Sequence, residues 1–230
     1  MGRSNKNITR RRLYEAFRAF MSKGDRSKIT VSAIIEEAGM NRKTFYNHFS
    51  TQDELAAWGF RDDLLRVLKD RYPTVSLMTP VTDPYRFDDL PCYVRIPSGA
   101  LALDQSGFFD AARQVIIENE RYYRALLQSD MAREFLRYLT ELLAAFLLED
   151  IDYLLKGRRM PLWAKERIAS FYAQGTVHFM ADSLVSRTVD KGDQESIPLI
   201  DNMVHESMRF LVETYQNEKS VEYFSKERFL

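Results

Sequence analysis

The stretch of residues 30–55, TVSAIIEEAGMNRKTFYNHFSTQDEL, has the pattern of two short helices around a tight turn, followed by the start of a third helix. Thr30 is suited to begin the first helix, because its side-chain oxygen can accept a hydrogen bond from a free backbone N–H. Apolar residues then recur at helical spacing, at Val31, Ile34, Ile35 and Ala38. Gly39 ends this helix, because glycine takes a left-handed backbone conformation without steric cost. The pattern predicts a helix-turn-helix.

The second helix of this pair is predicted to start after Asn41, a good capping residue, and to run over residues 42–49. Phe45 and Phe49 are four residues apart, so they share the face that turns inward. The other face carries donors and cations suited to base edges and phosphates in a major groove. Its residues are Arg42, Lys43, Thr44, Tyr46, Asn47 and His48.

The run from Ala38 to Phe49 resembles the recognition region of the tetracycline-repressor (TetR/AcrR) family of bacterial regulators. The resemblance extends to residues 9–24, where the family has a first helix that ends in Lys-Gly, and to residues 51–55, where it has a capped fourth helix. It covers roughly the first quarter of the chain. Segments 116–127 and 171–186 also resemble a C-terminal domain of some members associated with dihydroxyacetone metabolism, but they assign no effector.

The resemblance implies a homodimer that binds a double-stranded DNA operator with two half-sites and responds to a small-molecule effector of unknown identity. The DNA contacts that it implies are Thr30, Ser32, Asn41, Arg42, Lys43, Thr44, Tyr46, Asn47, His48 and Gln52. Two positions depart from the family pattern. Lys43 stands where the family often has a small residue, which predicts an added contact to base or phosphate. Gln52 stands where a phosphate-binding lysine commonly opens the fourth helix, which puts that charged anchor in doubt.

Charge is distributed unevenly along the chain, although the 230 residues carry 33 basic and 33 acidic side chains. Residues 1–50 hold eleven Lys or Arg against four Asp or Glu, and the remainder has the opposite excess of seven. Such a chain presents one basic end to a polyanion while the rest stays acidic. A solvated basic tail is the alternative. The tail residues Arg3, Lys6 and Arg10 could follow a minor groove or remain mobile.

The pattern along the whole chain predicts an all-α fold. An N-terminal three-helix domain, residues 1–50, is followed by a linking helix, 51–72, and by a C-terminal helical bundle for dimerisation and ligand sensing, 73–230. Five of the seven prolines fall within residues 73–107, which predicts a long irregular segment that acts as a cover over the core or as a mobile loop. Helices are expected over residues 105–129 in two parts, 130–156, 161–187 and 195–218.

The last two helices are apolar over more than a narrow stripe, which is typical of helices that meet both a core and a partner. A dimer interface is therefore predicted there, with a buried monomer core as the alternative. Its candidate residues are Ile168, Gly175, Phe179, Met203, Val204 and Phe210.

Aromatic residues gather in the C-terminal helices and predict a pocket for a ligand with an apolar body. The candidates are Tyr122, Tyr123, Phe135, Tyr138, Phe146, Trp163, Phe171 and Tyr172. Aromatic residues at helical spacing are more often plain core, and control by a protein partner is the alternative to a small molecule.

No catalytic pattern accompanies these features, so the chain is predicted not to be an enzyme and to need no cofactor. His178 with Asp182, and Asp201 with His205, have the i,i+4 spacing of a metal pair, but such pairs are common by chance and no metal is expected. The one cysteine, Cys92, excludes an internal disulfide and lacks the nearby cation of a redox sensor. With its longest apolar run only at residues 142–148, the chain is predicted to be cytoplasmic with no membrane partner.

Overall fold

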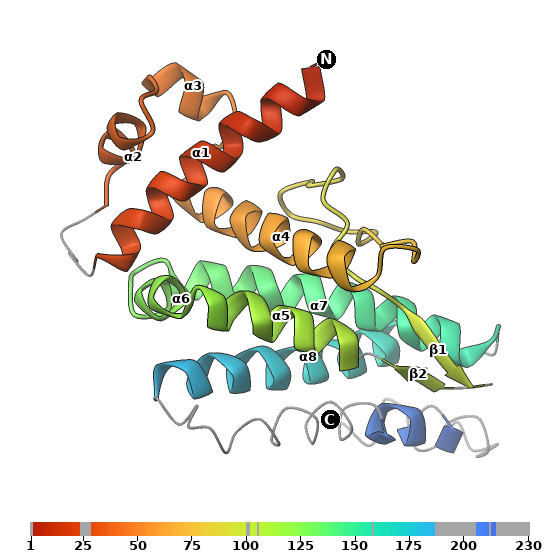
Figure 1. Ribbon diagram of the computed structural model, residues 1–230. Coiled ribbons are helices and arrows are strands. Elements are labelled where there is room, and N and C mark those ends of the chain that lie inside the picture. Colours follow the sequence, from red (N-terminus) through yellow and green to blue (C-terminus); the bar gives the residue numbers. More distant parts are fainter. Residues whose placement is uncertain are drawn as a thin grey trace.

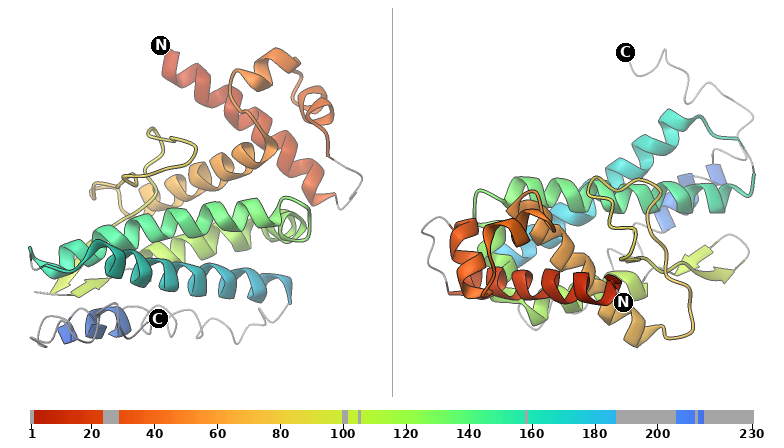
Figure 2. Two further views of the ribbon diagram at one scale, coloured as in Figure 1. Left: turned by 180° about the vertical axis from the view of Figure 1, so that it is seen from behind. Right: turned by 90° about the horizontal axis from the view of Figure 1, so that it is seen from above.

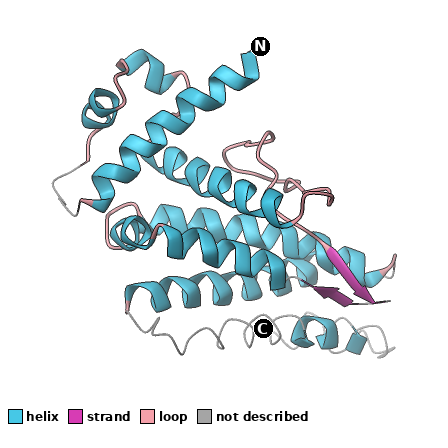
Figure 3. Cartoon of the chain, in the orientation of Figure 1, coloured by secondary structure: helices cyan, strands magenta, loops and turns pink. Residues whose placement is uncertain are grey.

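Helices dominate the computed structural model, which confirms the all-α class (Figures 1 and 3). The structure describes residues 2–23, 29–99, 102–104, 106–157, 159–186, 206–211 and 213–214. The helices of this part are α1 (Gly2–Ser22), α2 (Val31–Glu37), α3 (Arg42–Tyr46), α4 (Gln52–Arg71), α5 (Ser106–Glu118), α6 (Glu120–Leu127), α7 (Ala132–Leu155) and α8 (Leu162–Val185). Helices α1, α2 and α3 form one end of the molecule, and α4 leads from them into the layers of α5, α7 and α8 (Figures 1 and 2).

The N-terminal end is held together by side chains that the sequence pattern placed on inward faces. Leu13 and Phe17 of α1, Ile34 of α2, and Phe45 with Phe49 are all buried against Trp58 of α4 or its neighbours. Helix α1 begins at Gly2, earlier than the predicted start at Thr9. No apolar stripe precedes Thr9, so periodicity gave no signal for those first turns.

Helix α4 is unusual because three consecutive charged residues in its middle are buried: Arg61, Asp62 and Asp63. Burying a charge is costly unless it is paired and hydrogen-bonded, and each of these has a partner. Asp63 accepts a hydrogen bond from the hydroxyl of Tyr14 in α1 at 2.9 Å, and Asp62 pairs with Arg11. The linking helix is therefore tied to α1 by polar contacts as well as by packing.

Segment 73–95 is irregular, as predicted, and it packs on the helical core. Phe87, Leu90 and Tyr93 are buried, and the Tyr93 ring stacks on Phe146 of α7 with centroids 4.3 Å apart. The backbone N–H of Met78 donates to the carbonyl of Tyr93 at 2.8 Å, which closes the segment on itself.

A short antiparallel hairpin that the sequence did not predict follows this segment, β1 (Ile96–Gly99) with β2 (Ala102–Asp104). Its strands are too short to show an alternating pattern, and β1 contains Pro97, which weakens any strand signal. The helix expected over residues 195–218 lies mostly outside the described residues. Residues 206–211 and 213–214 within it are helical.

Candidate nucleic-acid interface

The helix-turn-helix geometry is fixed by the turn and caps that the sequence predicted. Gly39 has φ +63°, the left-handed conformation that favours glycine, and its N–H donates to the carbonyl of Glu36 at 3.0 Å. The Thr30 hydroxyl accepts from the N–H of Ala33 at 3.2 Å, and the Asn41 side chain accepts from the N–H of Thr44 at 2.8 Å. Both helices of the motif therefore start where the sequence analysis placed them.

Helix α3 is shorter than the predicted span 42–49, but its backbone bonds continue beyond Tyr46. The N–H of Asn47 donates to Lys43 at 3.0 Å, and the N–H of Phe49 donates to Phe45 at 2.9 Å. Phe45 and Phe49 are consequently both buried, at 0% and 1% exposure. The outward and inward faces are thus preserved although regular helix ends three residues early.

The predicted DNA contacts divide by exposure and by existing hydrogen bonds. Arg42, Lys43, Tyr46 and Asn47 are exposed, and the Arg42 guanidinium lies 5.7 Å from the centre of the Tyr46 ring. Ser32 is also exposed, on α2. These five side chains form the open surface of the motif.

The other predicted contacts are engaged within the protein. The side-chain oxygens of Thr30 and Asn41 are occupied by their caps, and the Thr44 hydroxyl donates to Asn41 at 3.1 Å. Gln52 donates from its side-chain nitrogen to the carbonyl of Ile29 at 2.8 Å. These residues position the two helices, and any DNA contact must use their remaining donors.

His48 is half-buried at the edge of this surface. Burial, and then the positive charges of Arg10 and Lys6, lower the pKa of His48 below its usual value. A lowered pKa favours the neutral ring in the free protein. An approaching phosphate would oppose this effect, because a negative charge favours the protonated ring.

Two arginines of α1 have roles that the sequence analysis did not assign. Arg10 is 8% exposed, lies over the Phe49 ring at 5.7 Å and pairs with Asp89 at 3.6 Å, so it is not a free tail residue. Arg12 donates to the carbonyl of Ala38 at 3.2 Å, at the end of α2. The sequence could not reveal these roles, because the partners of Arg10 and Arg12 come from segments that are distant in the chain.

Thr51 and Glu54 close the start of α4. The Thr51 hydroxyl accepts from the N–H of Glu54 at 3.1 Å, which is one half of a capping box. The Glu54 carboxylate accepts from the N–H of Ser50 at 2.6 Å, one residue before the position expected. Two N–H groups at this helix start, those of Ser50 and Glu54, are thus satisfied by neighbouring side chains.

The predicted aromatic pocket is only partly assembled. Tyr123 and Phe135 line an apolar cavity of about 60 Å³ between α4, α5, α6, α7 and α8. Its wall also contains Phe60, Phe109 and Thr176, which the sequence analysis did not select. This volume is well below the roughly 300 Å³ of a typical small-molecule site.

The other six predicted pocket residues do not line this cavity. Tyr122, Tyr138 and Phe146 are core residues packed elsewhere, and Tyr138 accepts a hydrogen bond from Arg61 at 3.2 Å. Trp163 and Phe171 are 37% and 72% exposed on α8. Tyr172 is half-buried and donates to Ser207 at 2.8 Å. Aromatic spacing alone did not distinguish core, cavity and surface.

Of the predicted interface residues, Gly175 and Phe179 lie on the exposed face of α8, with Phe171 one turn before Gly175. Ile168 is partly buried against the core. Phe210 is 65% exposed, and the Tyr172–Ser207 hydrogen bond brings its segment against α8. Met203 and Val204 lie outside the described residues.

The residues raised as metal or redox candidates have no such arrangement where they can be seen. His178 and Asp182 are exposed on α8, while Asp201 and His205 lie outside the described residues. Within the described ranges no group of three or more His, Cys, Asp or Glu is placed to hold a metal ion. The expectation that Cys92 lacks a nearby cation is wrong, because Arg61 is close enough to lower the pKa of its thiol; burial outweighs that effect and raises the pKa to about 12, so the thiol stays protonated. No helix in the described part of the chain is long and apolar enough to cross a membrane.

Comparison with known proteins agrees with this geometry. Residues 13–57 match the family described as "Bacterial regulatory proteins, tetR family", and residues 106–188 match "Transcriptional regulator C-terminal region". The chain belongs to the TetR family. Transcriptional regulators make up this family, in agreement with the prediction that the chain is not an enzyme.

A curated relative and a solved structure that match this chain both carry the name DhaS. The chain is 36% identical over 63 residues to the HTH-type dhaKLM operon transcriptional activator DhaS of Lactococcus lactis subsp. lactis (strain IL1403). This match covers 27% of the chain and 34% of the relative, about a third of its length. A solved structure, "Dihydroxyacetone kinase operon activator DhaS", superimposes with a TM-score of 0.52 at 18% identity, over 88% of this chain and 97% of that one. The likeness shows a shared fold.

Proposed function

We propose that this TetR-family protein is a homodimeric, ligand-responsive repressor that reads two operator half-sites with α3. The observation that carries the proposal is the open face of α3, where Lys43 and Tyr46 are exposed while Phe45 behind them is fully buried. A rigid helix with outward donors is the element that reads base edges in a major groove. A DNA partner also implies a cytoplasmic protein.

Dimerisation is supported by the exposed face of α8. Phe171 and Phe179 are 72% and 42% exposed, and no described residue beyond this stretch of α8 comes within 4 Å of the position that a Cβ on Gly175 would take. Large apolar side chains that gather on one exposed helix face mark an interaction site. A second copy of the same face satisfies the two-fold symmetry that two DNA half-sites require.

Ligand response is supported by the contacts that join the two ends of the molecule. Asp63 of α4 accepts a hydrogen bond from Tyr14 of α1. Arg61 of α4 donates a hydrogen bond to Asp83 of the irregular segment 73–95 at 2.6 Å. A ligand that binds one arrangement of these helices better than another would shift the separation of the two α3 helices in the dimer.

Activation of transcription, instead of repression, is a second candidate function. The curated relative and the solved structure are both named as activators. An activator uses the same α3 surface, but it binds beside the promoter and contacts the transcription machinery. Repression follows when the bound dimer covers the promoter itself.

The proposal is tested by a footprint on the DNA upstream of the gene that encodes this protein, together with a reporter assay for the same DNA. Protection of two half-sites about one helical turn apart, with higher reporter output when the gene is deleted, supports a repressor. Lower output on deletion identifies an activator. Absence of any site that binds more tightly than competitor DNA would contradict the proposed function.

A further inference from the structure

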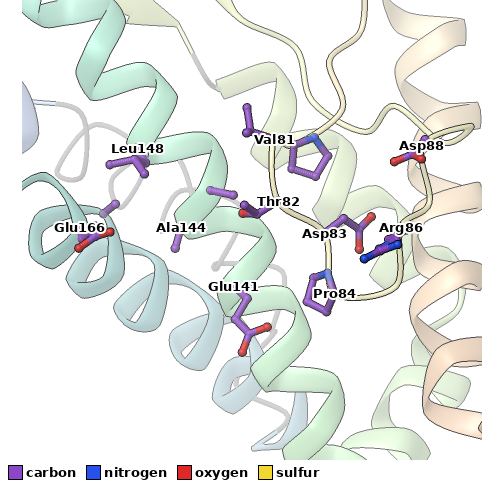
Figure 4. Close-up of a pocket in the computed structure, with 13 residues that line it drawn as sticks. Val81, Thr82, Asp83, Pro84, Arg86, Asp88, Glu141, Ala144, Leu148 and Glu166 are labelled. Atoms are coloured by element: carbon purple, nitrogen blue, oxygen red, sulfur yellow. The ribbon is translucent and has the colours of Figure 1, made fainter. Parts of the chain in front are cut away.

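An open groove of about 760 Å³ lies between segment 80–88 and helices α7 and α8 (Figure 4). Its volume falls in the range of roughly 300 to 1,000 Å³ that small-molecule sites occupy. None of the eight predicted pocket aromatics lines it. The groove therefore offers the space for an effector that the smaller apolar cavity lacks.

The charged side chains that line the groove are mostly acidic. Asp83 and Asp88 come from the segment, Glu141 from α7 and Glu166 from α8, and among the described lining residues Arg86 is the one cation. In Figure 4 Glu141 and Glu166 lie on the helix side, while Arg86 lies beside Asp83 on the segment side. Asp83 is already paired with Arg61 and Glu141 with Arg137, so Asp88 and Glu166 carry the acidic charge that the groove offers to a ligand.

Small and apolar side chains form the rest of the wall. Pro80 and Pro84 shape the segment side, while Ala144 and Leu148 of α7 and Ala169 of α8 line the floor. Alanines leave room where longer side chains would fill the groove. The shape and the chemistry together fit an organic cation with an apolar body.

The segment wall of the groove is fastened to the helix that leads to the DNA-binding end. Asp83 accepts a hydrogen bond from Arg61 of α4 at 2.6 Å, and Arg61 is 0% exposed. Arg61 also donates to the carbonyl of Phe87 at 3.1 Å and to that of Leu90. A shift of this wall cannot leave α4 unaffected, because the buried guanidinium would lose its partners.

We propose that this groove is the effector site, that it takes organic cations with an apolar body, and that the Asp83–Arg61 pair passes binding to α4. This rests on the proposed function as a ligand-responsive regulator. The cation acts only through a difference in affinity between the two arrangements of the segment.

Two probe ions of the same shape and opposite charge test the ligand class: tetraphenylphosphonium and tetraphenylborate. Calorimetry on the full chain should detect binding of the phosphonium, weakening as salt is added because exposed charges are screened. The borate should not bind. Equal binding of both ions would overturn the proposal, because it would mean that charge makes no contribution.

The site is tested by Glu166→Gln combined with Asp88→Asn. Loss of two partly exposed charges should weaken phosphonium binding by roughly threefold or more. Asp182→Asn is the matched control, because Asp182 is another exposed acid on α8 that does not line the groove. An unchanged affinity in the double variant, or an equal loss in the control, would overturn the assignment of the groove.

Operator affinity, measured with and without the phosphonium, tests the regulatory role and separates the two levels of the proposal. The expected result is a change in operator affinity in the wild type that disappears in the double variant. If the protein binds its operator specifically but the phosphonium leaves that affinity unchanged, the groove proposal fails and the DNA-binding function stands. If no specific DNA binding occurs without ligand, the function itself fails.

Discussion

Lys43 and Tyr46 are exposed side chains on α3 whose neighbours are fixed by packing, so their substitution tests DNA reading without disturbing the fold. Lys43→Ala and Tyr46→Phe should each weaken operator binding, by about 1 to 3 kcal/mol if the contact is to a base. If Lys43 contacts phosphate, affinity should fall equally on all sequences and the salt slope should shrink by about one. Fluorescence anisotropy at several salt concentrations measures both quantities. Unchanged affinity in both variants would remove α3 from the reading role.

Arg61 is fully buried and donates hydrogen bonds to Asp83, Phe87 and Leu90 of the irregular segment. Arg61→Met should lower the free energy of unfolding by about 3 to 5 kcal/mol, because it leaves Asp83 buried without its cation. Urea denaturation measures this change. Arg137→Met is the control, since Arg137 forms only exposed pairs with Glu134 and Glu141 and should cost at most about 1 kcal/mol. Equal losses of free energy of unfolding in the two variants would contradict the prediction that the buried Arg61–Asp83 pair contributes more to stability than an exposed pair.

His48 should make stability depend on pH. Its pKa in the folded protein lies below the usual value of about 6.5, so below that pH the unfolded chain binds the proton more readily. The contribution of His48 to the free energy of unfolding should therefore be complete above about pH 6.5. It should decrease as the pH falls through that value.

The variant His48→Gln should lose this part of the pH dependence in urea denaturation at pH 7.5 and 5.5. His178→Gln, at an exposed position on α8, is the control. Parallel pH dependence in wild type and His48→Gln would show that His48 does not contribute.

At the scale of elements, α8 has one face in the core and one face open. Phe179→Asp should place a charge without a partner in the proposed interface and separate the dimer. Ile117→Asp on α5 is a matched control, because Ile117 and Phe179 have similar exposure, 44% and 42%. Analytical ultracentrifugation decides between the states. A wild-type monomer at micromolar concentration would contradict the interface.

For the whole molecule, dimer geometry sets the spacing that the operator must have. Insertion of about 5 base pairs between the half-sites should abolish tight binding, because it turns them to opposite faces of the DNA, and insertion of about 10 should restore part of it. Gel-shift titration of the three operators measures the effect. Equal affinity for all three would show that each protomer binds alone.

How far the sequence predicts each part depends on the range of the forces involved. The turn at Gly39, the caps Thr30, Asn41 and Thr51, and the inward pair Phe45 and Phe49 were all predictable. Each depends on backbone stereochemistry or on neighbours within four residues, which periodicity and residue type report directly.

The predictions that depended on the path of the chain in space were less complete. Two of eight pocket candidates line the apolar cavity, and the larger groove involves none of them, because its walls come from segments about 60 to 80 residues apart. Arg10 looked like a free basic tail residue, yet it stacks on Phe49 and pairs with Asp89. Spacing within one helix does not report which distant segment will cover a side chain.

The sequence by itself therefore determined the helix-turn-helix and the helical class, since these follow from local stereochemistry and from the period of apolar residues. The family followed from the resemblance of its recognition region. Only the tertiary structure decided that Arg61 is buried and joined to Asp83, and that segment 80–88 forms one wall of an acidic groove. The physical reason is that a buried charge is costly unless it is paired and hydrogen-bonded. The partners that make such burial possible come from segments far apart in the chain.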